Sequence, residues 1–321
     1  MLLLTESDVL AIFSMETALE AVEASFKAQA EGGAVNHPRQ RIFLPGVSLD
    51  YMAAALPSEH LLGMKIYTVS RSALRFIVLL YESERGELLA LIEADQMGRI
   101  RTGAASGVAT KFLSREDSAS VGVIGSGRQA RTQLHAISLV RRLRSARVFS
   151  RDKSRREQFS KEMSQQLNLE VEPAESAEAA ARFGDVLITA TNAQEPVVHA
   201  EWLKPGVHIN AIGANVPSRR ELDDATLGRA SVIAVDSAAQ CRIEAGDLIQ
   251  GFAREPGGWQ SVAEMWEIIA GRKPGRKSSE DITIFKSTGM ALWDVAAAGV
   301  VYRRARELGR GKEVHISDVL P

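Results

Sequence analysis

The chain has 321 residues, 45% of them hydrophobic and 25% charged, with a formal net charge of −1. This length predicts two domains, each able to bury its own core, and the composition is that of a globular protein. The near-neutral charge excludes a global field that would recruit nucleic acid or an anionic membrane.

The N-terminus and the single cysteine bear on the compartment. The sequence turns polar directly after Leu4, too soon for a signal peptide, and no apolar run is long enough to span a bilayer. The lone Cys241 excludes an intramolecular disulfide and is interpreted as a small packed residue. These features predict a cytoplasmic protein without membrane partners.

The first part of the chain predicts a helix followed by a largely antiparallel sheet. Ser14 can cap a helix that continues to Ala30 and stops at Gly32. Four strand-like runs joined by short turns follow, without strand–helix alternation. These runs are 41–44, 63–69, 76–81 and 88–92. A helix rich in small residues then spans 100–113.

From residue 119 onward, strands alternate with helices, which predicts a parallel, doubly wound sheet. The predicted strands are 119–124, 146–149, 169–172, 185–190, 207–212 and 231–235. A last helix over 291–308 is expected to return and pack on the first domain. The fold class is therefore α/β.

The most specific motif is a glycine turn between the first of these strands and a helix. Gly125 permits a tight turn, Gly127 has no side chain to block a pyrophosphate, and Ala130 lets the helix pack close to the strand. The helix directs its free N–H groups and positive dipole end at the phosphates. The pattern predicts a dinucleotide site, and a turn that merely packs is the alternative. The candidate ligands in this turn are Gly125, Ser126, Gly127, Arg128, Gln129 and Ala130.

Cofactor choice is normally decided at the tip of the next strand. An acidic residue there binds the ribose 2′-OH of NAD, whereas an arginine meets the 2′-phosphate of NADP. This chain has Ser150 and then Arg151, and Asp152 comes late enough to cap the following helix. The sequence therefore favours NADP(H) over NAD(H), with a solvated basic face as the alternative. A nucleic-acid surface over 141–156 is disfavoured, because that region lacks interleaved aromatic residues.

Three cations in the first half lie among apolar or small residues: Arg41, Lys65 and Arg101. Lys65 lies within a strand, so it either faces solvent on one side of the sheet or lies in a cleft. Taken one at a time, each of them is better interpreted as facing solvent, because lysine is seldom buried unpaired.

Together, these motifs resemble the ornithine cyclodeaminase/mu-crystallin family. The landmarks run in order over nearly the whole chain: Arg41 and Met52, 63–65, 101–107, 125–127, 210–215, 220–223, 244–247 and 285–289. The resemblance implies a Rossmann domain over 114–289. It also implies an α+β substrate-binding and dimerisation domain built from 1–113 plus 290–321. Homodimers are expected to form through the N-terminal sheet.

The resemblance also implies roles for individual residues. Arg41, Lys65 and Arg101 would hold the substrate carboxylate, with Lys65 near the reacting carbon. Arginine suits this role through two-pronged contacts, and lysine can serve as a proton donor. No metal is expected. The further cofactor contacts implied are Thr102, Ser150, Arg151, Thr191, Asn192, Ser287, Thr288 and Gly289.

One position departs from the cyclodeaminases, which carry an aspartate where this chain has Asn215. An amide cannot exchange protons at a useful pH, so Asn215 can only orient a substrate or water. The sequence therefore predicts NAD(P)H-dependent reduction of a small imino acid, or the reverse oxidation of an amino acid. Two alternatives stay open: redox-neutral ornithine cyclodeamination, and a non-catalytic ligand-binding protein similar to mu-crystallin.

Overall fold

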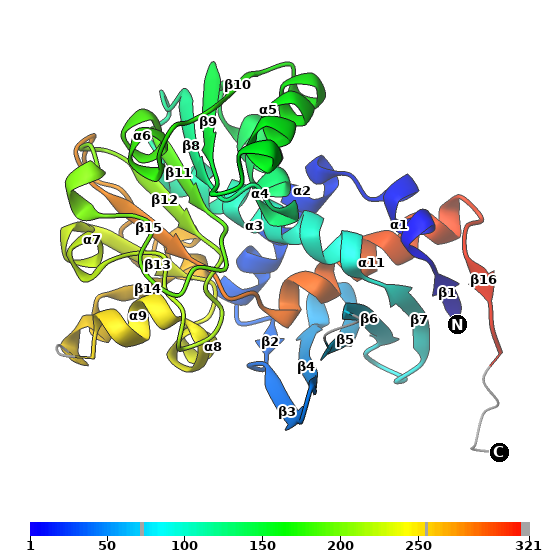
Figure 1. The fold of residues 1–321 in the computed structure, drawn as a ribbon. Coiled ribbons are helices and arrows are strands. Elements are labelled where there is room, and N and C mark those ends of the chain that lie inside the picture. Colours follow the sequence, from blue (N-terminus) through cyan, green and yellow to red (C-terminus); the bar gives the residue numbers. More distant parts are fainter. Residues whose placement is uncertain (71–73, 254–255, 316–321) are drawn as a thin grey trace. The chain divides into compact units, whose positions relative to one another are not determined.

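The computed structural model describes residues 1–70, 74–253 and 256–315 and divides into two compact units, whose elements Figure 1 labels. Unit 1 comprises Met1–Arg101 and Met290–Pro321, and unit 2 comprises Thr102–Gly289. The first boundary lies inside helix α3 (Asp95–Leu113), whereas the sequence placed it after residue 113. The boundary could not be predicted from the sequence, because α3 continues across it without a helix-breaking residue at Arg101 or Thr102.

Unit 1 is built on a mostly antiparallel sheet with the order β16-β1-β7-β6-β5-β4-β2, in which β3 pairs with β4. Its strands are β1 (Leu2–Leu4), β2 (Val35–Asn36), β3 (Gln40–Leu44), β4 (Val47–Leu56), β5 (Leu61–Ser70), β6 (Leu74–Glu82), β7 (Leu88–Glu93) and β16 (Lys312–Glu313). The four predicted strands are confirmed as β3, β5, β6 and β7. Strand β4 was missed, because its buried positions include Asp50 and Ala54, residues with little β propensity.

Three further helices belong entirely to unit 1: α1 (Glu6–Ile12), α2 (Met15–Ala30) and α11 (Ala291–Glu307). Ser14 caps α2 as predicted, since its hydroxyl accepts a hydrogen bond from Thr17 N at 3.3 Å. Helix α11 packs against α2, β4 and β5, and the rings of Phe26 and Trp293 meet edge to face at 5.6 Å. The C-terminal helix therefore covers one face of the N-terminal sheet.

Alternation along β5 determines which of its side chains α11 covers. Leu61, Gly63 and Lys65 are buried, whereas the residues between them are only partly so. A Cβ on Gly63 would lie 3.1 Å from Val295 of α11, so the glycine lets this helix approach the strand closely. Because side chains alternate with period 2, Lys65 faces α11 together with Gly63.

Unit 2 contains a sheet of eight strands in the order β10-β9-β8-β11-β12-β15-β13-β14, and every neighbouring pair is parallel. The strands are β8 (Ser120–Ile124), β9 (Ser145–Phe149), β10 (Glu170–Pro173), β11 (Val186–Thr189), β12 (His208–Ala211), β13 (Val232–Val235), β14 (Val262–Glu264) and β15 (Thr283–Lys286). The six predicted strands are confirmed as β8 to β13, while β14 and β15 were missed. The strand order reverses between β8 and β11, where doubly wound folds bind their ligands.

Helices separate most of these strands, as the alternation in the sequence predicted. They are α4 (Arg128–Val140), α5 (Lys153–Leu167), α6 (Ala177–Phe183), α7 (Asp224–Arg229), α8 (Ala238–Glu244), α9 (Gly246–Gly251) and α10 (Met265–Ile269). Short 3₁₀ turns lie at Pro57–Glu59 in unit 1 and at Ala200–Trp202 and Pro256–Gln260 in unit 2. In the described part of the chain, no helix combines the length and apolar character needed to cross a membrane.

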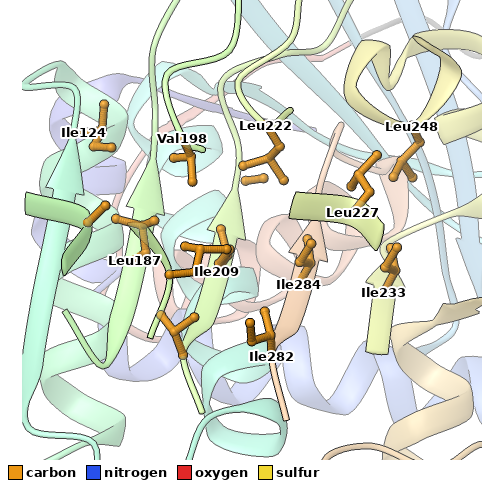
Figure 2. Packing of buried hydrophobic residues seen from close by; sticks show 14 of the residues in the cluster. Ile124, Leu187, Val198, Ile209, Leu222, Leu227, Ile233, Leu248, Ile282 and Ile284 are labelled. Carbon is orange, nitrogen blue, oxygen red and sulfur yellow. The ribbon is translucent and has the colours of Figure 1, made fainter. Parts of the chain in front are cut away.

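The core of unit 2 lies on both faces of the sheet. Figure 2 shows one cluster, to which Ile124 of β8 and Leu187 of β11 contribute. Val123 and Ile188, one position away on the same strands, belong to a second cluster. Burial of successive residues explains why these strands read as continuous apolar runs.

Candidate active site

The turn after β8 has the geometry of a phosphate-binding loop. Gly125 has a φ of +108°, and a Cβ there would collide with the carbonyl oxygen of Ala190. Gly127 is the N-cap of α4, and the space where its Cβ would lie is open. Arg131 stabilises the turn, because it donates to Ser126 O at 2.7 Å and pairs with Glu162. The backbone N–H groups at the start of α4 are thus available to an anion.

A cavity of about 1130 Å³ opens over this turn. Nine of the predicted cofactor residues line it: Gly125, Ser126, Gly127, Arg128, Gln129, Ser150, Arg151, Thr191 and Asn192. Ala130 lies beneath the cavity in the core, which agrees with its predicted packing role. Thr102 and the Ser287–Gly289 turn are not part of this lining. Cavities of this size hold ligands as large as cofactors.

The strand tip that governs cofactor choice carries no carboxylate in the critical position. The Ser150 hydroxyl accepts from Ser126 at 2.9 Å and joins the tips of β8 and β9. Asp152 caps α5, as predicted, by accepting from Arg155 N at 3.1 Å. Arg151 is exposed beside the cavity, and Arg155 and Arg219 also line it. The cavity wall is therefore rich in guanidinium groups.

A buried carboxylate from the landmark 220–223 holds another part of the cavity wall. Glu221 accepts hydrogen bonds from Thr191 N, Thr191 Oγ1 and Gly213 N, each at 2.7 Å. Burial raises the pKa of Glu221, and the nearby Lys286 opposes that shift. Lys286 in turn pairs with Asp247 at 2.9 Å. Glu221 thus ties Thr191 of the cavity wall to the loop after β12.

A second buried carboxylate, Asp236, holds the Ser287–Gly289 turn after β15. One of its oxygens accepts from Ser287 Oγ, Thr288 N and Gly289 N at 2.6–2.9 Å. The Cys241 thiol lies 3.5 Å from the other oxygen, and burial raises its pKa well above the usual value. A buried, protonated thiol agrees with the packing role predicted for Cys241.

In unit 1, two of the predicted cations share one buried carboxylate. Lys65 Nζ donates to Asp294 Oδ1 at 3.0 Å. Arg101 donates from Nε to Oδ1 and from Nη2 to Oδ2, also at 3.0 Å. Lys65 is 5% exposed, Arg101 4% and Asp294 0%, so the solvent-facing interpretation is wrong for both cations. Asp294 had no role in the sequence analysis, although an aspartate in the apolar run 291–301 is a readable signal.

The third cation of the cluster is Arg39 rather than Arg41. Arg39 is buried beside Met52, whose partner across the β4–β5 ladder is Lys65, and its charge acts on Lys65. Arg41 lies on β3 and pairs with Asp50 at 2.7 Å. The two arginines are separated by one residue, so spacing alone could not choose between them. We therefore assign the carboxylate-binding role expected of Arg41 to Arg39, as a proposal.

The cluster carries an excess of positive charge in a buried place. Lys65 and Arg101 share the Asp294 carboxylate, which leaves these three side chains with a formal charge of +1, and the buried Arg39 acts on Lys65 as a further cation. Burial lowers the pKa of Lys65 to about 8; Arg101 and Arg39 add to this shift, and Asp294 opposes it. Among the described residues, nothing accepts a hydrogen bond from the buried Arg101 Nη1. Such a cluster is suited to a small anion, above all a carboxylate.

The remaining candidate, Asn215, is exposed in the loop after β12 in unit 2. One set of side chains in the described residues could share a metal ion: His60, Glu82 and Glu84 in unit 1. Glu82 is already engaged there, because it accepts from the backbone N–H groups of Glu84 and Arg85.

The chain is similar in sequence and in fold to known proteins. The sequence profile of the ornithine cyclodeaminase/mu-crystallin family matches residues 1–309. Alanine dehydrogenase of Archaeoglobus fulgidus is 35% identical over 98% of both chains. The structure of Thermococcus litoralis Delta(1)-pyrroline-2-carboxylate reductase with NADH and L-proline superposes with a TM-score of 0.94 at 37% identity, covering 98% of this chain and 100% of that one. An archaeal alanine dehydrogenase dimer with bound NAD gives a TM-score of 0.93 at 34% identity, covering 98% and 99%.

The two glycines of the turn yield a paired prediction. Gly125→Ala introduces a Cβ into the Ala190 carbonyl at a positive φ, so we expect it to cost about 1–3 kcal/mol of stability as well as cofactor affinity. Gly127→Ala meets open space, so its unfolding temperature should stay unchanged while cofactor affinity falls roughly tenfold or more. Thermal unfolding and nicotinamide fluorescence titration measure both effects. Equal cofactor affinity in Gly127→Ala and the unaltered protein would contradict the assigned phosphate path.

Proposed function

Because the chain belongs to the ornithine cyclodeaminase/mu-crystallin family, we propose that it reduces the C=N bond of a small imino acid with NADPH, or catalyses the reverse oxidation. It is an NAD(P)-dependent oxidoreductase acting on C–N bonds. The observation that carries the proposal is that Lys65 and Arg101 are buried together on Asp294, with the buried Arg39 acting on Lys65. A protein that only bound a ligand would not need a lysine whose pKa is lowered to about 8, close to neutral pH.

The residues of this chain divide the work. The bound cofactor supplies or accepts the hydride. Arg101, whose Nη1 has no acceptor among the described residues, and Arg39 hold the substrate carboxylate. Lys65, with a pKa near 8, donates a proton to the imine nitrogen during reduction and removes one during oxidation. Holding the reactants in this way can account for several kcal/mol of barrier lowering.

This assignment predicts opposite pH profiles for the two directions. For reduction, kcat/KM should fall above about pH 8 as Lys65 of the free enzyme loses its proton, and for oxidation it should rise through the same value. Lys65→Met should abolish turnover while leaving cofactor affinity intact. The substrates to test are cyclic imines such as pyrroline-2-carboxylate, and 2-oxo acids with ammonia or methylamine.

Two further measurements distinguish the proposal from redox-neutral ornithine cyclodeamination and from a non-catalytic binding protein. Nicotinamide absorbance distinguishes net redox from a redox-neutral cycle. Ornithine should not yield proline, because Asn215 cannot carry protons. Substantial proline formation would replace the proposal with cyclodeamination, and failure of every imine to oxidise NADPH or NADH would refute it.

The NADP(H) preference is the second part of the proposal. Arg151 lies exposed on the cavity wall after Ser150, which has no carboxylate to repel a 2′-phosphate, and the Asp152 carboxylate that follows caps α5. Arg151→Ala should lower kcat/KM for NADPH by an amount that corresponds to about 1.5–3 kcal/mol of activation free energy. It should leave kcat/KM for NADH unchanged. The control is Arg182→Ala, which removes an exposed guanidinium that pairs with Glu178 on α6. Better use of NADH than of NADPH by the unaltered protein would contradict the preference.

We also propose a homodimer formed through the sheet of unit 1. Exposed apolar side chains lie together where β3 meets β4 and β5 meets β6, a patch made of Ile42, Phe43, Leu44, Val47, Val69 and Leu74. Phe43 is 73% exposed, and a patch of this kind marks an interface. A second copy of this chain fits it, since one structurally similar relative is an alanine dehydrogenase dimer.

Phe43→Glu tests the dimer. A charge on the patch should convert the dimer into monomers, measured by sedimentation velocity. Leu10→Glu alters a residue that is 57% exposed on α1, away from the patch, and should leave the dimer intact. A dimer unaffected by Phe43→Glu would place the interface elsewhere.

A further inference from the structure

Asp294 joins three elements that are distant in sequence. It lies in the first turn of α11, Lys65 comes from β5, and Arg101 comes from α3. Its Oδ1 accepts from both Lys65 Nζ and Arg101 Nε, each at 3.0 Å. One carboxylate oxygen therefore fixes the distance between the two cations.

We propose that Asp294 is the positioning residue of this site: it orients Arg101 toward the substrate carboxylate and keeps Lys65 protonated. This inference rests on the proposed function, because the proton in question is the one that Lys65 exchanges with the substrate. Asp294 itself has no exposed surface, so it acts through its two partners.

The charges around Lys65 explain why the carboxylate is needed. Arg101 from α3 and Arg39 from the segment between β2 and β3 both disfavour the ammonium form, and so does burial. Asp294 opposes them. The ring of Phe76 on β6, 4.9 Å from Nζ, adds a weaker attraction. Without Asp294, Lys65 would face two guanidinium groups inside the protein and would lose its proton at a lower pH.

Orientation of Arg101 is the second effect. Nε and Nη2 are both engaged by Asp294, and the guanidinium lies 5.5 Å from the ring of Trp293, the preceding residue on α11. These contacts fix the plane of the guanidinium and leave Nη1 as its free donor among the described residues. A planar guanidinium held along one edge presents its remaining N–H groups in a fixed direction.

Asp294→Asn is the decisive variant, since it preserves shape and removes charge. The amide oxygen can still accept from Lys65 and from Arg101 Nε, and the N–H₂ then lies opposite Arg101 Nη2, so the negative charge is lost beside both cations. We expect the pH above which reduction declines to move down by about one unit or more. At pH 8, kcat/KM should fall roughly tenfold or more, with cofactor affinity unchanged.

A matched control separates positioning from stability. Asp185 in unit 2 is a mostly buried carboxylate that pairs with Lys204 at 2.8 Å and Arg115 at 3.2 Å. Asp185→Asn should lower the unfolding temperature without moving the pH profile. If Asp294→Asn behaves in the same way, with reduced stability and an unmoved midpoint, its role is structural and the inference is overturned.

A measurement that needs no turnover keeps this inference separate from the proposed function. The Lys65 resonance in protein labelled with ¹³C at the lysine ε carbon, assigned with Lys65→Met, reports the titration directly. Its midpoint should fall in Asp294→Asn. The double variant Arg101→Met with Asp294→Asn removes one charge of each sign. In it, the titration midpoint of Lys65 should fall less than in Asp294→Asn alone. An unshifted resonance overturns the role of Asp294, whereas a shifted one in a protein that reduces no imine refutes the proposed function alone.

Discussion

The arrangement of unit 1 depends on the burial of positive charge against a single carboxylate. Removing a lysine and an arginine from water costs several kcal/mol each unless a counter-charge and hydrogen bonds compensate. Asp294 provides both from the first turn of α11, where the helix dipole favours a negative charge. The side chain of Asn36 on β2 also accepts from Leu292 N at 3.1 Å, which fixes the start of that helix. The C-terminal helix is thus part of the site and not only a cover for the sheet.

Unit 2 uses buried carboxylates for a different purpose, to hold backbone loops at the carboxyl ends of its strands. Glu221 binds Thr191 and the N–H of Gly213, and Asp236 binds the N–H groups of Thr288 and Gly289. A carboxylate that accepts several backbone N–H bonds fixes a loop without the regular pairing of a sheet. Hydrogen bonds of this kind order the loops before a ligand binds, which reduces the entropy lost on binding.

Sequence reasoning succeeded where a local pattern determines the structure. The glycine turn, the caps at Ser14 and Asp152 and the six strands from β8 to β13 all follow from spacing and residue type. It failed where long-range packing decides. Strand β4 has weak propensity and exists because β3 and β5 pair with it, and Asp294 meets Lys65 across 229 positions of sequence. The choice between Arg39 and Arg41 was equally out of reach, since it depends on where β3 begins and on the pairing of Arg41 with Asp50 across the β3–β4 ladder.

The cation cluster does not by itself determine which substrate side chain is accepted. Under the proposed function, Arg39, Lys65 and Arg101 would bind the substrate carboxylate, a group common to alanine, proline and their imines, so they would not distinguish among these compounds. Discrimination among them must then come from the shape of the pocket around the rest of the substrate. That discrimination is modest, because a missing or additional methylene in an apolar pocket changes binding by only about 1–3 kcal/mol. Three large side chains contact these cations: Met52 lies beside Arg39, Phe76 beside Lys65 and Trp293 beside Arg101. Each packs directly on a cation, so a substitution that reshapes the pocket for a new side chain also alters the field around Lys65. The proposed function therefore implies that substrate choice and proton transfer are coupled through the same few contacts.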